Sequence, residues 1–242
     1  MAGPGSNRVS PFPREILAQD TETAARRLIG ARLSRGTGPE GRSGRIVEVE
    51  AYIGQEDMAS HARVGRTKRN AVMFGPAGAA YVYLVYGMHH CLNVVTEAEG
   101  RPAAVLIRAV EPVLGADRMR AGRVQLATGR SGPESSSGES SRRRLEALPV
   151  TRLASGPGLV CAAFSVNRTD DGTDLCDPAA SLRLEIAADD EPLPVAVGPR
   201  IGIDYAPEPW RSRPWRFYVP GNASVSIAGS APRTASSDGS AS

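Results

Sequence analysis

Four segments with the pattern of β-strands follow one another along the chain, and only short links separate the last three. They cover residues 44–53, 79–86, 91–96 and 103–110, and apolar residues at alternating positions are typical of strands with one buried face. Strands joined by short turns pair antiparallel, whereas parallel pairs need a long crossover. The order predicts an α+β fold with a mainly antiparallel β-sheet surrounded by helices, not a doubly wound parallel sheet.

Helices are predicted at two places. One begins with a capping residue at Asp20 or Thr21 and stops at Gly30, and the other covers residues 156–164 after a Ser-Gly-Pro start. Short strands are predicted late in the chain, over residues 182–186, 200–203 and 215–219.

Segments rich in small and polar residues lie at both ends and once inside the chain. Residues 1–12 and 227–242 have little to bury, so we expect disordered tails there. Residues 129–144 are rich in serine and are predicted to form a flexible low-complexity loop. Because apolar segments flank this loop, we expect one domain over residues 13–226.

Composition narrows the class of protein. The sequence has no apolar run of membrane-spanning length and no signal-peptide core near its start, which predicts a soluble cytoplasmic protein, nucleoid-associated if bacterial. Three widely spaced cysteines favour neither a disulfide framework nor a zinc module, so no metal or other cofactor is expected. A net charge of +3 is compatible with a polyanionic partner.

Two carboxylates lie on one face of the first strand. The two-residue period places Glu48 and Glu50 on the same side, together with Ile46 and Tyr52. Neighbouring carboxylates repel each other, which raises the pKa of one of them and suits it to act as a general base. The alternative is a solvent-exposed polar face, and strand geometry alone does not choose between the two glutamates.

A basic loop and a tyrosine-rich hairpin follow. Residues 63–70 carry four cationic side chains, which suits contact with phosphates or, alternatively, an ordinary solvated loop. Three of the six tyrosines fall at Tyr81, Tyr83 and Tyr86. Cross-strand pairing explains Tyr81 but not Tyr86, which falls at the turn. Enzymes that act on a base in a duplex extrude it and hold it between aromatic surfaces.

Long segments of this chain resemble the alkyladenine (3-methyladenine) DNA glycosylase family. The segments EAYIGQEDMASH, GRTKRNAVMFGPAGAAYVYLVYGMHHCLNVVT and LIRAVEP are similar to its core, and SGPGLVCAAFSVNR and RPWRFYVPGNASVS to its C-terminal part. The similarity runs from about Pro13 to Ser226. It implies a single compact domain, different from the helix-hairpin-helix glycosylases, with a protruding β-hairpin, and a monomer that binds double-stranded DNA containing damaged purines.

The resemblance also implies roles for individual residues. Glu50 matches the base that activates water, and Glu48 is then only its neighbour. Two departures concern DNA contacts: His89 and His90 replace bulkier aromatic residues, and Leu159 stands where several relatives have a lysine. The other implied roles are catalytic positioning by Arg108, base binding by Tyr52, His61, Tyr83 and Asn93, insertion into DNA by Tyr86 and Met88, and DNA backbone contact by Arg66, Lys68 and Arg69.

The implied reaction is hydrolysis of the N-glycosidic bond of an alkylated purine. Release of an uncharged deaminated or etheno purine needs a proton or hydrogen bonds to the base, to which His61 is a candidate contributor. Because Lys68 is the only lysine and lies in the basic loop, a bifunctional glycosylase that cuts the strand through a lysine Schiff base is disfavoured.

Two further alternatives differ in their chemistry. A metal-dependent hydrolase would draw on the histidines and Cys91, but their spacing matches no zinc motif. A non-catalytic sensor of damaged DNA would share every feature except the need for Glu50. We therefore predict a monofunctional glycosylase that leaves an abasic site.

Overall fold

One antiparallel sheet organises the chain in the computed structural model, which describes residues 9–85, 87–129 and 136–226. Within these ranges nine strands pair antiparallel, seven of them in the order β1-β7-β2-β3-β6-β5-β4, and β9 pairs with both β3 and β8. The predicted α+β fold with a mainly antiparallel sheet is confirmed. The strands are β1 (Val9–Pro11), β2 (Arg32–Arg35), β3 (Arg42–Ile53), β4 (Ala80–Val85), β5 (His89–Val95), β6 (Ala103–Leu114), β7 (Leu182–Ala187), β8 (Ala196–Gly198) and β9 (Arg216–Tyr218).

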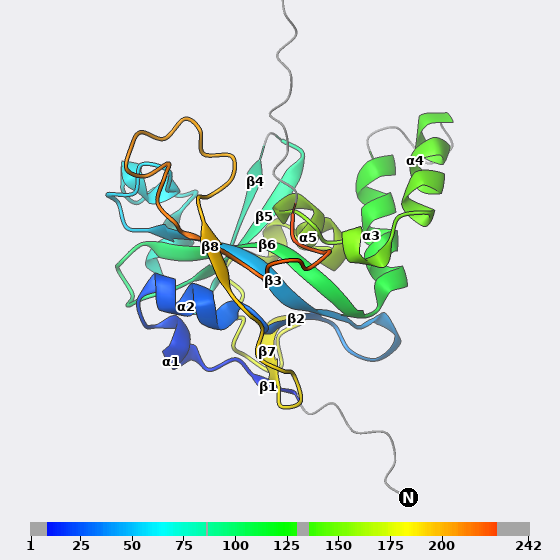
Figure 1. Cartoon of the computed structure of the whole chain (residues 1–242), viewed down its shortest axis with the longest axis horizontal. Coiled ribbons are helices and arrows are strands. Elements are labelled where there is room, and N and C mark those ends of the chain that lie inside the picture. The colour runs from blue at the N-terminus through cyan, green and yellow to red at the C-terminus, as the bar shows by residue number, and fades with distance from the viewer. Residues whose placement is uncertain (1–8, 86, 130–135, 227–242) are drawn as a thin grey trace, which may run out of the picture.

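Helices pack around the sheet in two groups (Figure 1). The helices α1 and α2 lie at the lower left of this view, and α3 and α4 lie at the right with α5 beside the sheet. Asp20 caps α2 by accepting a hydrogen bond from the Thr23 amide at 2.9 Å, as its sequence predicts. The helices are α1 (Arg14–Leu17), α2 (Thr21–Leu28), α3 (Ala116–Thr128), α4 (Ser136–Glu146) and α5 (Pro157–Phe164), with short 3-10 helices η1 (Gly38–Glu40), η2 (His61–Val64), η3 (Ala71–Phe74), η4 (Val150–Arg152) and η5 (Arg168–Asp170).

The long strands β3 and β6 form the centre of the sheet. Their register shifts between Ile46 and Glu48 and again between Glu48 and Val49. At these shifts Val47 has no paired residue on β6, and Arg108 has none on β3. Such bulges turn side chains away from strict alternation and are common beside active sites. Ile46 accordingly lies in the main apolar core, instead of sharing the face of the glutamates as predicted.

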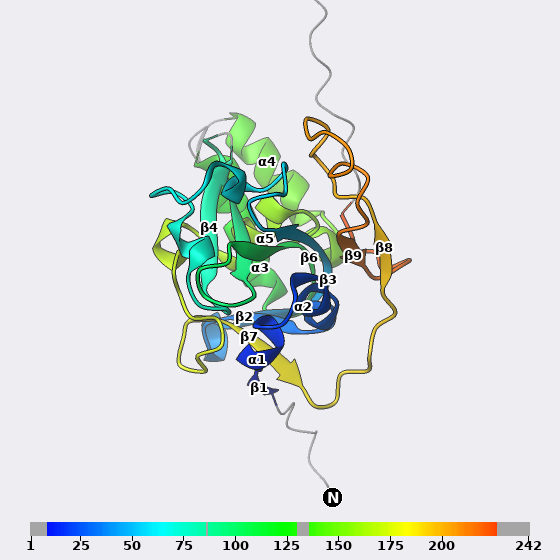
Figure 2. The ribbon, with the colours of Figure 1, turned by 90° about the vertical axis from the view of Figure 1, so that its left-hand side faces the viewer.

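Different parts of the chain lie on the two sides of the central strands. Figure 2 shows β4 on one side and the segment after β8, in orange, on the other, with β3 and β6 between them. The β4–β5 hairpin is the predicted one, and Tyr83 pairs with Cys91 across it. Sequence segments more than a hundred residues apart thus lie on the two sides of the central strands.

Several predicted boundaries are wrong. Residues 136–144, expected in a loop, belong to α4, where Arg143 and Glu139 form an ion pair at 2.6 Å one helical turn apart. The helix α3 was not predicted, and β6 runs past Pro112 to Leu114. Residues 200–203 form no strand; instead the Ile201 amide donates to the Glu50 carboxylate, and the Arg200 guanidinium donates to the Ala51 carbonyl.

The chain ends also differ from expectation. Residues 9–11, expected in the N-terminal tail, pair as β1 with β7, and Phe12 is buried in the main core. The predicted C-terminal tail at 227–242 and the loop residues 130–135 lie outside the described residues. None of the described helices is long and apolar enough to cross a membrane.

Candidate active site

A cavity of about 520 Å³ opens beside the β4–β5 hairpin. Its wall comes from the hairpin, from β6, from η2 and from the segment after β8. Ligand cavities usually have between about 300 and 1,000 Å³, so one nucleobase with its sugar fits. Six of the residues to which the sequence assigns a role line this cavity: Tyr52, His61, Arg69, Tyr83, Asn93 and Arg108.

Glu50 does not itself line this cavity and is completely buried, but its neighbours Tyr52, Arg108 and Ile201 are lining residues. Its Oε2 accepts a hydrogen bond from the Tyr52 hydroxyl at 2.9 Å, and its Oε1 accepts one from the Ile201 amide at 2.6 Å. The guanidinium of Arg108 lies 3.2 Å from the same Oε1. Burial raises the pKa of Glu50 above its ordinary value, although Arg108 and these hydrogen bonds oppose the shift. A carboxylate with a raised pKa is a stronger proton acceptor.

Glu48 is equally buried but differs in its partners. Its Oε1 accepts hydrogen bonds from Arg108 at 3.1 Å, Arg216 at 2.7 Å and the Ser226 hydroxyl at 2.9 Å. Its Oε2 accepts one from the Ser226 amide at 2.6 Å. Four donor groups engage Glu48, against three for Glu50, and its partners Arg216 and Ser226 do not line the cavity, so Glu48 has less capacity left for a water molecule. It serves instead as an anchor for the arginine that contacts Glu50.

Aromatic side chains form one wall of the cavity. The rings of His61 and Tyr83 meet edge to face with centroids 4.4 Å apart, and Tyr81 and Tyr83 are 5.3 Å apart. Nδ1 of His61 lies 3.0 Å from the Tyr81 hydroxyl. Burial, aided by Arg69 and Arg63, lowers the pKa of His61 to about 4. The ring is therefore neutral at pH 7 and can hydrogen-bond a base, but it holds no imidazolium proton to give.

Asn93 lies on β5 with its side chain almost completely buried at the cavity wall. Its Nδ2 donates to the carbonyl of Tyr81 at 3.0 Å. This bond fixes the orientation of the amide. A fixed amide is suited to discriminate between bases by their edge groups.

Of the described residues predicted to contact duplex DNA, only Arg69 lines the cavity. Tyr86 is outside the described residues, and Met88 is 38% exposed. Arg66, Lys68 and Arg69 are exposed, and none of them has a carboxylate partner among the described residues. Arg69 reaches the cavity, where its guanidinium lies 5.7 Å from the centre of the Tyr83 ring.

Long-range partners of the site were not found by sequence reasoning. Arg200 makes a buried bidentate ion pair with Asp57, at 2.5 and 2.9 Å, which holds the backbone of Ile201 against Glu50. Arg216 and Ser226 anchor Glu48 from the C-terminal part of the chain. No local pattern predicts these pairs, and only the similarity of the segment that contains Arg216 gave a signal.

Metal binding was one of the alternatives. The parts of the chain that the structure describes contain no group of three or more histidine, cysteine, aspartate or glutamate side chains placed to hold a metal ion.

The antiparallel sheet thus holds a buried carboxylate close to a cavity with an aromatic wall. A family model described as methylpurine-DNA glycosylase matches residues 15–223, so the chain belongs to the methylpurine-DNA glycosylase family.

Curated relatives agree along nearly the whole chain. A Myxococcus xanthus protein is 42% identical over 218 residues, which cover 89% of this chain and 93% of the relative. A Methanocella arvoryzae protein is 44% identical over 218 residues, covering 89% and 95%. A Nocardia farcinica protein is 44% identical over 227 residues, covering 90% and 92%. Each is named "Putative 3-methyladenine DNA glycosylase".

Proposed function

We propose that this protein is a monofunctional DNA glycosylase that takes an alkylated purine out of double-stranded DNA into the cavity and hydrolyses its N-glycosidic bond. The observation that carries the proposal is the buried Glu50, held by Tyr52, Arg108 and the Ile201 amide beside a cavity of nucleobase size. The names of the relatives support 3-methyladenine as a substrate.

Glu50 acts as the general base in this mechanism. Its carboxylate takes a proton from water while the water oxygen forms a bond to C1′ of the deoxyribose. The bond from C1′ to the purine nitrogen breaks, and the base leaves with the electron pair. An alkylated purine is cationic, so it departs as a neutral molecule without a proton from the enzyme. The neutral His61 agrees with this, because it is no acid at pH 7.

Extrusion of the base is supported by the layout of the face. The aromatic wall of His61 and Tyr83 offers stacking surfaces. The exposed cations of the basic loop offer phosphate contacts, and the hairpin end with Tyr86 and Met88 would fill the gap left in the duplex. Since no lysine lines the cavity, the reaction stops at an abasic site.

Base release from a duplex that carries one alkylated purine tests the proposal. We expect wild type to release the base under single-turnover conditions and Glu50→Gln to lose at least about a hundredfold in rate, as general-base catalysis contributes about 10²–10⁴. Glutamine keeps the size of the side chain, so a melting temperature at or above the wild-type value excludes misfolding. Unchanged release by Glu50→Gln would refute the assigned base, and wild-type binding without release would favour the non-catalytic sensor.

A further inference from the structure

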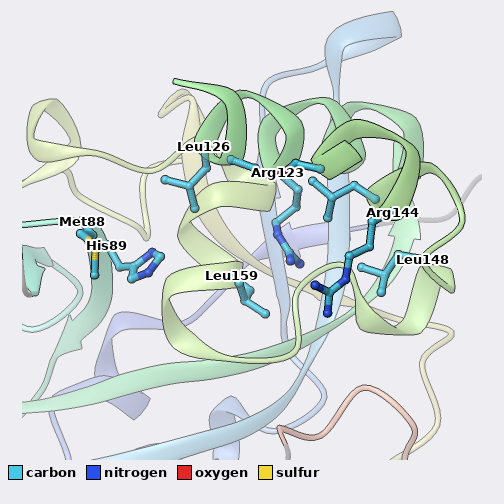
Figure 3. Close-up of a pocket in the computed structure, with 10 residues that line it drawn as sticks. Met88, His89, Arg123, Leu126, Arg144, Leu148 and Leu159 are labelled. Carbon is cyan, nitrogen blue, oxygen red and sulfur yellow. The ribbon is translucent and has the colours of Figure 1, made fainter. Parts of the chain in front are cut away.

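A second cavity, of about 360 Å³, lies on the other side of the hairpin end, between α3, α4 and α5 (Figure 3). Met88 and His89 form its hairpin side, and three leucines from three different segments, Leu126, Leu148 and Leu159, form much of its apolar wall. We call it the α4 groove. Its lining includes Leu159, where the resemblance to the glycosylases led us to expect a lysine.

The charges of the α4 groove have one sign. Among the described residues, two arginines line it and no carboxylate does. Arg123 is used internally, because its Nη1 donates to the carbonyl oxygens of Leu153 at 2.6 Å and Arg152 at 3.3 Å. Arg144 differs, since it makes no hydrogen bond or ion pair within the described part of the chain. Figure 3 shows it extending from α4 toward Leu159.

We propose that the α4 groove holds the sugar–phosphate backbone of the DNA next to the inserted hairpin, with Arg144 paired to a phosphate. The leucines would pack on the apolar C–H edges of the deoxyribose. Arg144 is exposed, so its guanidinium is accessible to a phosphate, with which arginine forms bidentate hydrogen bonds. Leu159 is then compensated by a cation that reaches the same place from α4.

DNA is the occupant of the α4 groove that agrees with the proposed function. Met88 belongs both to the hairpin end assigned to the duplex and to the wall of the α4 groove. A duplex that receives the hairpin therefore runs across this groove. The purely cationic lining suits a polyanion, whereas an acidic protein segment or a second copy of the chain would need to compete with DNA for the same face.

Arg144→Ala tests the proposal, with Arg143→Ala as the matched control. Arg143 is the next residue on α4 and already pairs with Glu139. We expect Arg144→Ala to weaken binding of an undamaged duplex of about 25 base pairs about fivefold. It should also reduce the slope of log affinity against log salt by about 0.9, the value for one lost phosphate contact in B-DNA. Arg143→Ala should change both by less.

A double variant separates a contact in the groove from diffuse charge. Leu159→Lys in the Arg144→Ala background should restore the affinity and the salt slope, because both side chains line the same groove. Equal effects of Arg144→Ala and Arg143→Ala, or no rescue by Leu159→Lys in a protein of normal melting temperature, would overturn the proposal. So would DNA binding that Arg144→Ala leaves intact while it abolishes self-association in sedimentation.

The inference rests on the proposed glycosylase function, but the two can fail separately. Base release by the wild type reports on Glu50, whereas the affinity and the salt slope of binding to undamaged DNA report on Arg144. Normal release with no effect of Arg144→Ala on binding would refute the α4 groove alone. Absence of base release from the wild type would refute the glycosylase while the salt slopes still report on the groove.

Discussion

Nη1 of Arg108 lies 3.2 Å from Oε1 of Glu50, and the same guanidinium donates through Nε to Glu48 at 3.1 Å. One arginine on β6 therefore joins two buried carboxylates of β3. The bulges beside Glu48 make this possible, because they leave Arg108 without a ladder partner and turn its side chain toward both glutamates. The position of the proposed base is thus set by an ion network, not by its strand alone.

Arg108→Lys is expected to retain the charge but lose the bridge, because an ammonium is a point charge without the planar fork. We expect single-turnover base release to fall at least tenfold. Removing one partner of a buried pair costs about 3–5 kcal/mol of unfolding free energy, so Arg108→Ala should be clearly less stable than Arg108→Lys in urea. Wild-type rates in Arg108→Lys would contradict a role in holding Glu50.

Glu48→Gln separates positioning from chemistry. The negative charge of Glu48 contributes to the raised pKa of Glu50, so its removal should move the acidic limb of the pH–rate profile to lower pH. The plateau rate should also fall, because Arg108 and Arg216 lose their anchor. A merely structural residue would lower stability without moving the limb, and an unmoved limb would count against this assignment.

Glu50 should cost the folded protein stability at neutral pH. Because burial raises its folded-state pKa above the unfolded value of about 4.5, ionisation disfavours the folded state once the pH rises past that value. Thermal denaturation should show Glu50→Gln more stable than wild type at pH 8, with the difference lost near pH 4. As the pH falls, the rate of base release by the wild type should reach half its plateau value at a pH above 4.5. A glutamine variant less stable at every pH would contradict this.

His61 should make the protein sensitive to mild acid. Its pKa falls from 6.5 to about 4 on folding, so between these values the unfolded state binds more protons. The unfolding free energy therefore decreases as the pH falls from 6.5 to 4. Urea denaturation across this range should show a weaker pH dependence for His61→Gln than for wild type. Parallel curves would mean that the ring is protonated in the folded state.

Strand cleavage should be absent from the pure enzyme. Schiff-base chemistry needs an amine at the abasic sugar, and Lys68, the only lysine, does not line the cavity. Denaturing electrophoresis should show intact strands that break only after alkali. Lys68→Gln should release the base at the wild-type rate at saturating DNA, and cleavage that disappears in this variant would overturn the monofunctional assignment.

Local sequence patterns predicted most of the fold. Alternation predicted β3 and the β4–β5 hairpin, and a capping aspartate predicted α2. The serine-rich composition around residue 140 hid α4, whose stability includes the Glu139–Arg143 pair and contact with α3. Strand periodicity could not anticipate the bulges that move Ile46 into the core.

Only those residues of the candidate site that lie close together in the sequence were predictable. Glu50 and Tyr52 are two residues apart, and only the family resemblance selected Glu50 over Glu48 as the base. The partners that set its environment come from far along the chain, 151 residues away for Ile201. Such contacts follow from packing of the whole domain, and a single sequence gives no periodic signal for them.

The contact between Ser226 and Glu48 spans 178 residues, which gives the reaction centre an order of completion. A ribosome makes β3, the hairpin and β6 long before residue 226 leaves it. Until then Glu48 lacks two of its four donors and Arg108 lacks a fully anchored partner. A chain that ends between β9 and residue 226 therefore has every described strand but not all the contacts of Glu48, so the proposed reaction centre is completed by the last part of the domain to be synthesised.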